Sequence, residues 1–123
     1  MKYGIFGDIH GNLEALEAVF LDMEEQGVTH PLCLGDLVGY GANPAECLEA
    51  IRALGCPVVR GNHDDLATMK KTPSSFSEAA RISLEYVRGQ LNPSQLNFIR
   101  RIPMIWTEDP RSEEHTSELQ SRQ

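Results

Sequence analysis

Apolar and polar positions over the first 60 residues predict short buried strands separated by amphipathic helices. Apolar runs at 3–6, 31–34 and 57–60 are each long enough for one short strand. Between them, residues 13–26 and 44–54 place apolar side chains at helical spacing with charged residues in between. This order of strand, helix, strand, helix, strand favours parallel pairing with helices packed on the faces of a sheet.

Residues typical of helix ends support these boundaries. Asn12 is suited to cap the first helix, and Gly27 is suited to end it. The second helix begins with Asn43 followed by Pro44, a proline at the first helical position, and Gly55 closes it.

After residue 65 the pattern becomes mainly helical. One apolar stripe predicts a helix, and its members are Phe76, Ala80, Leu84, Val87 and Leu91. Asn92 begins a further helix that carries Leu96, Phe98, Ile99 and Ile102. Residues 104–107 are predicted to form a fourth strand.

The last 13 residues, RSEEHTSELQSRQ at 111–123, differ in character from everything before them. They contain a single aliphatic residue, Leu119, among polar and charged ones. They could form a solvated tail. The segment also closely resembles the translation of a common DNA-sequencing adapter, and we interpret it as a non-native tail that follows a domain portion at 1–110.

Composition limits the classes of function. The 123 residues suffice for one domain, and 41% hydrophobic and 24% charged residues are ordinary for a globular protein. The formal net charge of -7 disfavours a stable nucleic-acid partner. No leader peptide or membrane span is recognisable, and the three cysteines lack C-x-x-C spacing, so free thiols in a reducing cytoplasm are expected. The oligomeric state stays open.

Each of the three predicted strands is followed by a short polar motif: GDIHGN, LGDLVGYG and RGNHDD. Ligands of parallel α/β sheets gather beyond the carboxyl ends of the strands, so these motifs can converge although they are distant in sequence. Asp8 and His10 lie two residues apart and could reach one cation together. Asp36 could bridge two ions through its two oxygens. Mixed carboxylate and imidazole ligation suits manganese, iron or zinc.

The third motif adds candidates of other kinds. Asn62 offers a neutral amide oxygen to a metal. His63 could donate a proton to a leaving group or stabilise charge on a phosphoryl oxygen. Asp64 could hydrogen-bond the far nitrogen of His63 and set its tautomer. Each motif alone could be a turn or a helix cap, and the case for a site is that all three occur in order behind strands.

GDIHGN, GDLVGYG and GNHD resemble the first three signature blocks of the calcineurin-like metallophosphoesterase superfamily. The resemblance covers residues 1 to about 110. Within it, the segment GDLVGYGANP is similar to a small bacterial phosphodiesterase-type branch of the superfamily. It implies a four-layer α/β/β/α sandwich and two divalent metal ions, with manganese favoured over iron, zinc or nickel. It also implies hydrolysis of phosphate mono- or diesters by a metal-bridging hydroxide. The implied metal ligands are Asp8, His10, Asp36 and Asn62, and the implied catalytic residues are His63 and Asp64.

The sequence departs from the family pattern in two places. Gly39-Tyr40-Gly41 replaces the Asp-Arg-Gly of protein phosphatases and diadenosine tetraphosphatases. The later histidines of the family have no counterpart: His30 precedes the second predicted strand and is interpreted as a surface or loop residue, and His115 lies in the tail interpreted as non-native. We therefore expect a fragment truncated after about the fourth strand, weak or inactive alone.

Two alternatives to the enzyme remain open. One is a non-catalytic module that binds a metal or phosphate with the first half of the fold. The other is a flavodoxin-like α/β binding domain in which the aspartates and histidines occur by coincidence. If the chain is an enzyme, its expected partner is a small phosphate ester or a nucleotide and not a membrane.

Overall fold

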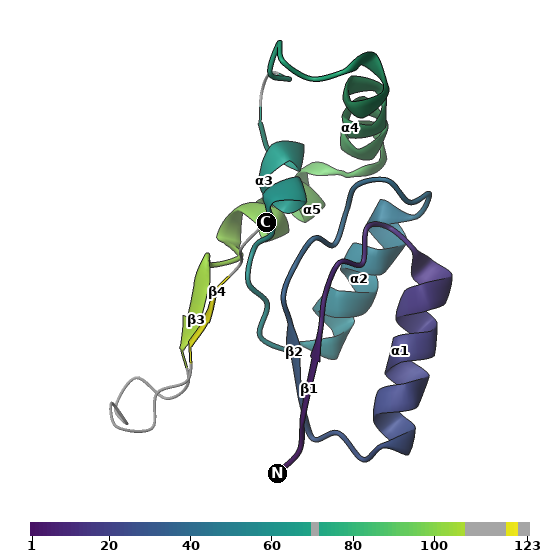
Figure 1. Cartoon of the computed structure of the whole chain (residues 1–123), viewed down its shortest axis with the longest axis vertical. Helices are drawn as coiled ribbons and strands as arrows, with labels where there is room; N and C mark the ends of the chain where they lie inside the picture. The colour runs from purple at the N-terminus through teal and green to yellow at the C-terminus, as the bar shows by residue number, and fades with distance from the viewer. Residues whose placement is uncertain (70–71, 108–117, 121–123) are drawn as a thin grey trace.

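The computed structural model describes residues 1–69, 72–107 and 118–120. Its N-terminal part is built on a parallel pair of strands (Figure 1). Strand β1 (Tyr3–Phe6) runs alongside β2 (His30–Cys33), with Ile5 opposite Leu32. The predicted parallel pairing of the first two strands, and with it the α/β class, is confirmed.

The third predicted strand, at 57–60, is reduced to a single bridge. Val58 pairs in parallel with Cys33, whose N–H donates to the carbonyl of Pro57. Two residues later the chain leaves the sheet, because the N–H of Arg60 donates to the carbonyl of Pro103 at 2.8 Å. The segment occupies the predicted place beside β2 without forming a strand of its own.

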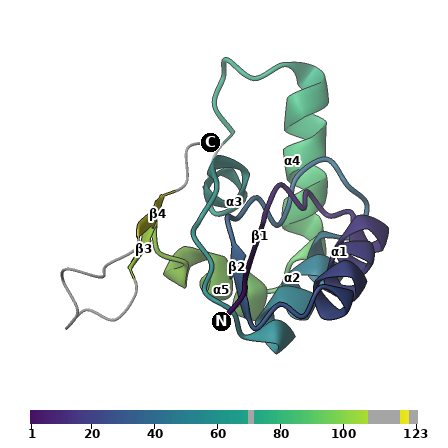
Figure 2. The ribbon, with the colours of Figure 1, turned by 60° about the horizontal axis from the view of Figure 1, so that its bottom comes forward.

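Helices α1 (Leu13–Glu25) and α2 (Pro44–Leu54) lie on the same side of the two strands in both views of the ribbon (Figures 1 and 2). The Asn12 side chain accepts a hydrogen bond from Ala15, which confirms the predicted cap of α1. Gly55 ends α2 in the left-handed conformation that favours glycine. Leu48 of α2 is fully buried in the hydrophobic core.

Three helices follow the third motif: α3 (Asn62–Ala67), α4 (Glu78–Gln90) and α5 (Pro93–Arg101). Helix α4 contacts both α2 and α3, and α3 also contacts α5. The predicted start of α5 is confirmed by a capping box in which Asn92 and Gln95 exchange hydrogen bonds. The apolar faces of α4 and α5 join the core through Val87 and Ile99, which are almost completely buried.

The fourth predicted strand is present, but it pairs outside the central sheet. Strand β3 (Ile105–Thr107) forms an antiparallel pair with β4 (Glu118–Gln120). The predicted non-native segment thus contains β4, while the remainder of 111–123, including His115, lies outside the described residues. Its foreign origin and the domain boundary near 110 stay predictions.

Several smaller expectations can also be compared with the structure. The three cysteines are free, with Cys33 and Cys47 buried and Cys56 half-buried. His30 is an exposed residue at the start of β2, and its Nδ1 lies 2.7 Å from the Thr29 hydroxyl, so its interpretation as a surface residue is confirmed. Within the described ranges, no helix has both the length and the apolar character needed to cross a bilayer.

Candidate metal centre

Main-chain hydrogen bonds join the loops that follow β1 and β2. The N–H of Asp8 donates to Gly35 at 3.1 Å, and the N–H of His10 donates to Asp36 at 2.7 Å. Gly41 returns to the first loop by donating to the carbonyl of His10 at 2.6 Å. The predicted convergence of the first two motifs therefore occurs through the backbone itself.

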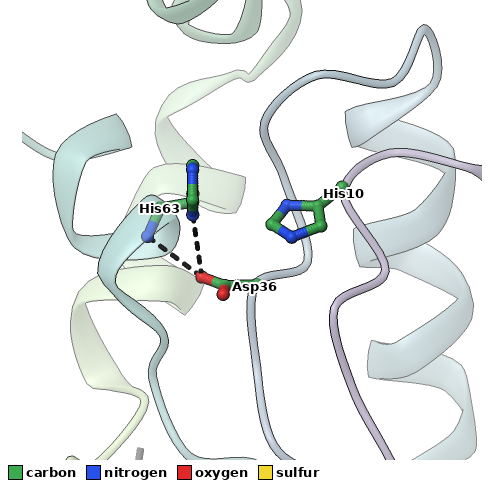
Figure 3. A group of neighbouring side chains, drawn as sticks. All are labelled: His10, Asp36 and His63. Atoms are coloured by element: carbon green, nitrogen blue, oxygen red, sulfur yellow. Dashed lines mark hydrogen bonds and ion pairs between the residues drawn. The ribbon is translucent and has the colours of Figure 1, made fainter. Parts of the chain in front are cut away.

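Side chains from all three motifs meet at this point. Ligand atoms of His10, Asp36 and His63 lie within 4.8 Å of one another, and we call these three residues the cluster (Figure 3). Nδ1 of His63 is 3.5 Å from Oδ1 of Asp36, which also accepts the His63 main-chain N–H at 3.0 Å. The two imidazole rings are 4.8 Å apart between centroids. Asp36 is fully buried and both histidines are partly exposed.

The backbone is strained where the first two motifs present their side chains. Asp8, His10 and Asp36 have φ values of 53°, 49° and 53°, in the left-handed region that residues other than glycine seldom adopt. Such conformations cost of order 1 kcal/mol each and persist where surrounding structure imposes them. The main-chain bonds between the loops supply that constraint.

Two polar atoms of the cluster are buried without a hydrogen-bond partner among the described residues. They are Oδ2 of Asp36 and Nδ1 of His63. Burial is the largest influence on Asp36 and raises the pKa of its carboxyl above the usual value, the nearby Asp8 raises it further, and both histidines oppose the rise. A buried carboxylate oxygen without a partner is costly, and a bound cation offsets this cost. Carboxylate with imidazole is also a donor set suited to a transition metal. The cluster therefore fits a divalent cation.

The other two predicted ligands lie at the edge of the cluster. The Asp8 side chain is 67% exposed, and its Oδ1 is 3.7 Å from Nε2 of His10. Asn62 is the exposed first residue of α3, directly before His63. The structure thus brings Asp8 to the cluster with His10 and Asp36, and ligation by Asn62 stays a prediction.

The expected hydrogen bond between Asp64 and the His63 ring is wrong. The buried Asp64 carboxylate instead accepts main-chain N–H groups: Oδ2 takes those of Asp36 at 2.8 Å and Gly61 at 3.1 Å, and Oδ1 takes that of Leu37 at 2.8 Å. Burial raises its pKa to about 6, and the hydrogen bonds from these amides act in the opposite direction. Asp64 holds the loop that presents Asp36, so it is a positioning residue.

Tyr40 is part of the site although the sequence singled it out only as a departure from a motif. Its hydroxyl lies 3.1 Å from Nε2 of His63, and its ring centroid lies 4.9 Å from that of His63 and 5.2 Å from that of His10. The side chain is 73% exposed. An exposed aromatic residue between two loop glycines, shortly after a candidate ligand, is the signal that could have found it.

Two glycines permit the close packing of the cluster. A Cβ at Gly61 would collide with the Asp36 carboxylate, and a Cβ at Gly39 would come within 3.1 Å of Cδ2 of His63. Gly39 also has a φ of +100°, which residues with a side chain rarely adopt. Glycine at these positions is required by space for the functional side chains as well as by the turn.

These features define an α/β protein with a candidate metal centre at the carboxyl ends of its strands. The sequence matches the family model described as calcineurin-like phosphoesterase over residues 1–113, so the chain belongs to that family. One relative is the uncharacterized protein MJ0912 of Methanocaldococcus jannaschii, which is 41% identical over 105 residues. That alignment covers 85% of this chain and 43% of the relative.

Solved structures agree with this assignment. A metallophosphoesterase from Sphaerobacter thermophilus is 35% identical with a TM-score of 0.74, covering 88% of this chain and 44% of that one. The hypothetical protein PH1004 from Pyrococcus horikoshii OT3, at 23% identity, shares the fold with a TM-score of 0.72, covering 85% of this chain and 49% of that one. The predicted metallophosphoesterase fold is confirmed, and the chain spans less than half the length of these relatives.

Proposed function

We propose that this chain supplies the first part of an active site for metal-dependent hydrolysis of phosphate mono- or diesters. The observation that carries the proposal is the cluster: Asp36 Oδ2 and His63 Nδ1 are buried without hydrogen-bond partners among the described residues, and the His10 ring lies beside that of His63. Asp8, His10, Asp36 and Asn62 are the proposed ligands. Because the chain spans less than half of its relatives, the residues described here account for a share of the complete site.

The proposed residues have different roles in the hydrolysis of a phosphate ester. Divalent ions, when bound, would supply Lewis acidity toward water and the phosphoryl oxygens. In hydrolysis, water oxygen bonds to phosphorus, the bond from phosphorus to the ester oxygen breaks, and that oxygen takes a proton. His63 would deliver this proton or stabilise the phosphoryl charge, and the contacts of its ring with Tyr40 and Asp36 support this role because they orient the imidazole. Asp64 contributes by holding the backbone of the Asp36 loop.

The mixed donor set of carboxylates and imidazoles accepts manganese, iron, zinc or nickel. We propose manganese, in line with the family resemblance, and test it against zinc. The substrate class is a small phosphate ester or a nucleotide, because a chain of net charge -7 offers little attraction to a long polyanion outside its metal centre.

Calorimetric titration of the 123-residue chain with Mn²⁺, and in parallel with Zn²⁺, tests the proposal. We expect binding that His10→Ala weakens at least about tenfold, because removing a direct ligand typically has an effect of this size or larger. His30→Ala is the matched control, since His30 is exposed and its Nδ1 contacts the Thr29 hydroxyl instead of a residue of the cluster. Asp8→Asn with Asp36→Asn should abolish binding while circular dichroism shows the helices retained.

Turnover is followed separately with bis(4-nitrophenyl) phosphate and Mn²⁺. We expect slow release of nitrophenol that depends on both the metal and His63. Tight Mn²⁺ binding without turnover both in this chain and in a longer chain that restores the rest of the domain would favour the non-catalytic module instead. Equal Mn²⁺ binding by the parent and the doubly substituted chain would refute the metal centre itself.

A further inference from the structure

A cavity of about 260 Å³ opens directly beside the cluster. Tyr40 and His63 form the wall nearest the cluster, and Leu66 of α3 with Leu84 and Val87 of α4 form much of the remainder. Its boundary is therefore shared with the proposed site, because His63 belongs to both the cavity and the cluster.

The chemistry of the cavity differs from that of the cluster. Among the described residues, its lining includes no Asp, Glu, Lys or Arg, and its polar side chains besides Tyr40 and His63 are the hydroxyls of Ser77 and Ser83. A lining of this kind favours an uncharged, largely apolar group with one or two hydrogen-bonding atoms. It does not suit a second phosphate.

Hydrogen bonds hold the cavity walls in place. The Tyr86 hydroxyl on α4 donates to the carbonyl of Ala42 at 2.7 Å, which ties α4 to the loop that carries Tyr40. Arg88, also on α4, donates to the carbonyl of Leu66 at 3.1 Å, which ties α4 to α3. The cavity is therefore preformed by bonds that do not involve the cluster.

We propose that this cavity receives the organic group of the phosphate ester, and that it selects a planar aromatic group of one ring system, such as a phenyl ring or a nucleobase. The proposal rests on the proposed function and adds the substrate class. A cavity of about 150 Å³ accommodates benzene, so 260 Å³ holds one ring system but not a second nucleoside. An ester whose phosphate lies at the cluster has the cavity as the adjacent space, with the Tyr40 and His63 rings available for aromatic contact.

Helix α4 offers a matched pair of variants. Ala80 lines the cavity, whereas its neighbour Ala79 does not, and both are exposed alanines on the same helix. Ala80→Phe places a ring at the opening of the cavity, and Ala79→Phe adds the same ring outside it. Ser83→Leu is a second variant that fills the cavity from another position without altering the cluster.

Affinities for phenyl phosphate and methyl phosphate are compared by calorimetry at saturating Mn²⁺. We expect the parent chain to prefer phenyl phosphate at least about tenfold, since burying an aromatic ring accounts for a factor of this size or larger. Ala80→Phe and Ser83→Leu should remove most of this preference, and Ala79→Phe should retain it.

The failures of the two proposals are distinguishable. Equal affinity of the parent for both esters, with Mn²⁺ bound normally, overturns the cavity assignment and leaves the metal centre standing. A preference that survives both Ala80→Phe and Ser83→Leu also overturns it. Absence of Mn²⁺ binding by the parent overturns the proposed function, and the assignment of the cavity to an ester group is then refuted with it.

Discussion

The main-chain N–H of Asp36 donates to Oδ2 of Asp64 at 2.8 Å, so one buried carboxylate fixes the backbone that presents another. The residues are 28 positions apart in sequence and both are fully buried. Placing two carboxylates in one interior is unfavourable: burial raises the pKa of Asp64, and the nearby Asp36 raises it further. The amides that surround Asp64 compensate for this at one of them, which leaves Asp36 available for a cation.

Removing the Asp64 carboxylate should therefore destabilise the fold as well as the site. Asp64→Ala leaves buried amides of Asp36, Leu37 and Gly61 without their acceptor. We expect the free energy of unfolding to fall by about 3 kcal/mol, measured by urea denaturation. Asp65→Ala is the control, because its 55% exposed side chain has an ion pair with Arg60, and such pairs contribute less than about 1 kcal/mol. Equal losses in the two variants would contradict the special role of Asp64.

Glycine substitutions should separate crowding from helix propensity. Gly61→Ala forces a Cβ against the Asp36 carboxylate, and we expect a loss of about 1–3 kcal/mol together with weaker Mn²⁺ binding. A Cβ added at Gly89, in α4, would meet no atom within 4 Å, so Gly89→Ala should stabilise the fold by about 0.5–1 kcal/mol. Thermal unfolding and metal titration measure both effects. A Gly61→Ala variant of parental stability and metal affinity would show that the Asp36 loop can move aside.

The cysteines should be poorly reactive despite being free. Burial raises the pKa of Cys33 to about 12 and that of Cys47 to about 11, so almost no thiolate is present at about pH 8. We expect neither to be alkylated by iodoacetamide in the folded protein, with both modified in urea, as read by mass spectrometry. The raised values also mean that the stability these thiols contribute is present below about pH 9 and declines as pH rises toward 12. Rapid labelling of Cys33 under the same native conditions would show that the β2 region opens frequently.

The outer face of β1 should promote association of the 123-residue chain. Ile5 is 57% exposed and Tyr3 is 39% exposed, at alternate positions of the same strand. We expect concentration-dependent oligomers in sedimentation velocity, reduced by Ile5→Lys. Ile82→Lys on α4 is the matched control, because Ile82 is also 57% exposed but does not lie on the strand pair. Monodisperse behaviour of the parent chain would contradict this expectation.

Local signals predicted the helices well. Asn12, Gly55 and Asn92 each act within a few residues of their own position, so their capping roles could be inferred from sequence. The strand expected at 57–60 was harder, because its extent depends on the bond from Arg60 to Pro103, which is distant in the chain. Periodicity cannot show how far a short apolar run remains paired.

In the candidate site, too, the sequence predicted some features, and others depend on tertiary packing. Sequence placed Asp8, His10, Asp36 and His63 behind strands, and strand-end topology was enough to predict that they converge. The amides that donate to Asp64 and the contact between Tyr40 and His63 depend on how two loops meet, and residue type gives no information about that. The relation of α4 to the cavity beside His63 was likewise visible only in three dimensions.

The bonds between the first two loops have a consequence for redesign. Asp8, His10 and Asp36 are presented by backbone that is joined through N–H and carbonyl groups, which every residue except proline can provide. Donor atoms at Asp8 and His10 can therefore be exchanged, for example to change metal preference, while the backbone that sets their spacing is retained. Asp36 differs, because its side chain also accepts the main-chain N–H of His63 and so helps to position the third loop.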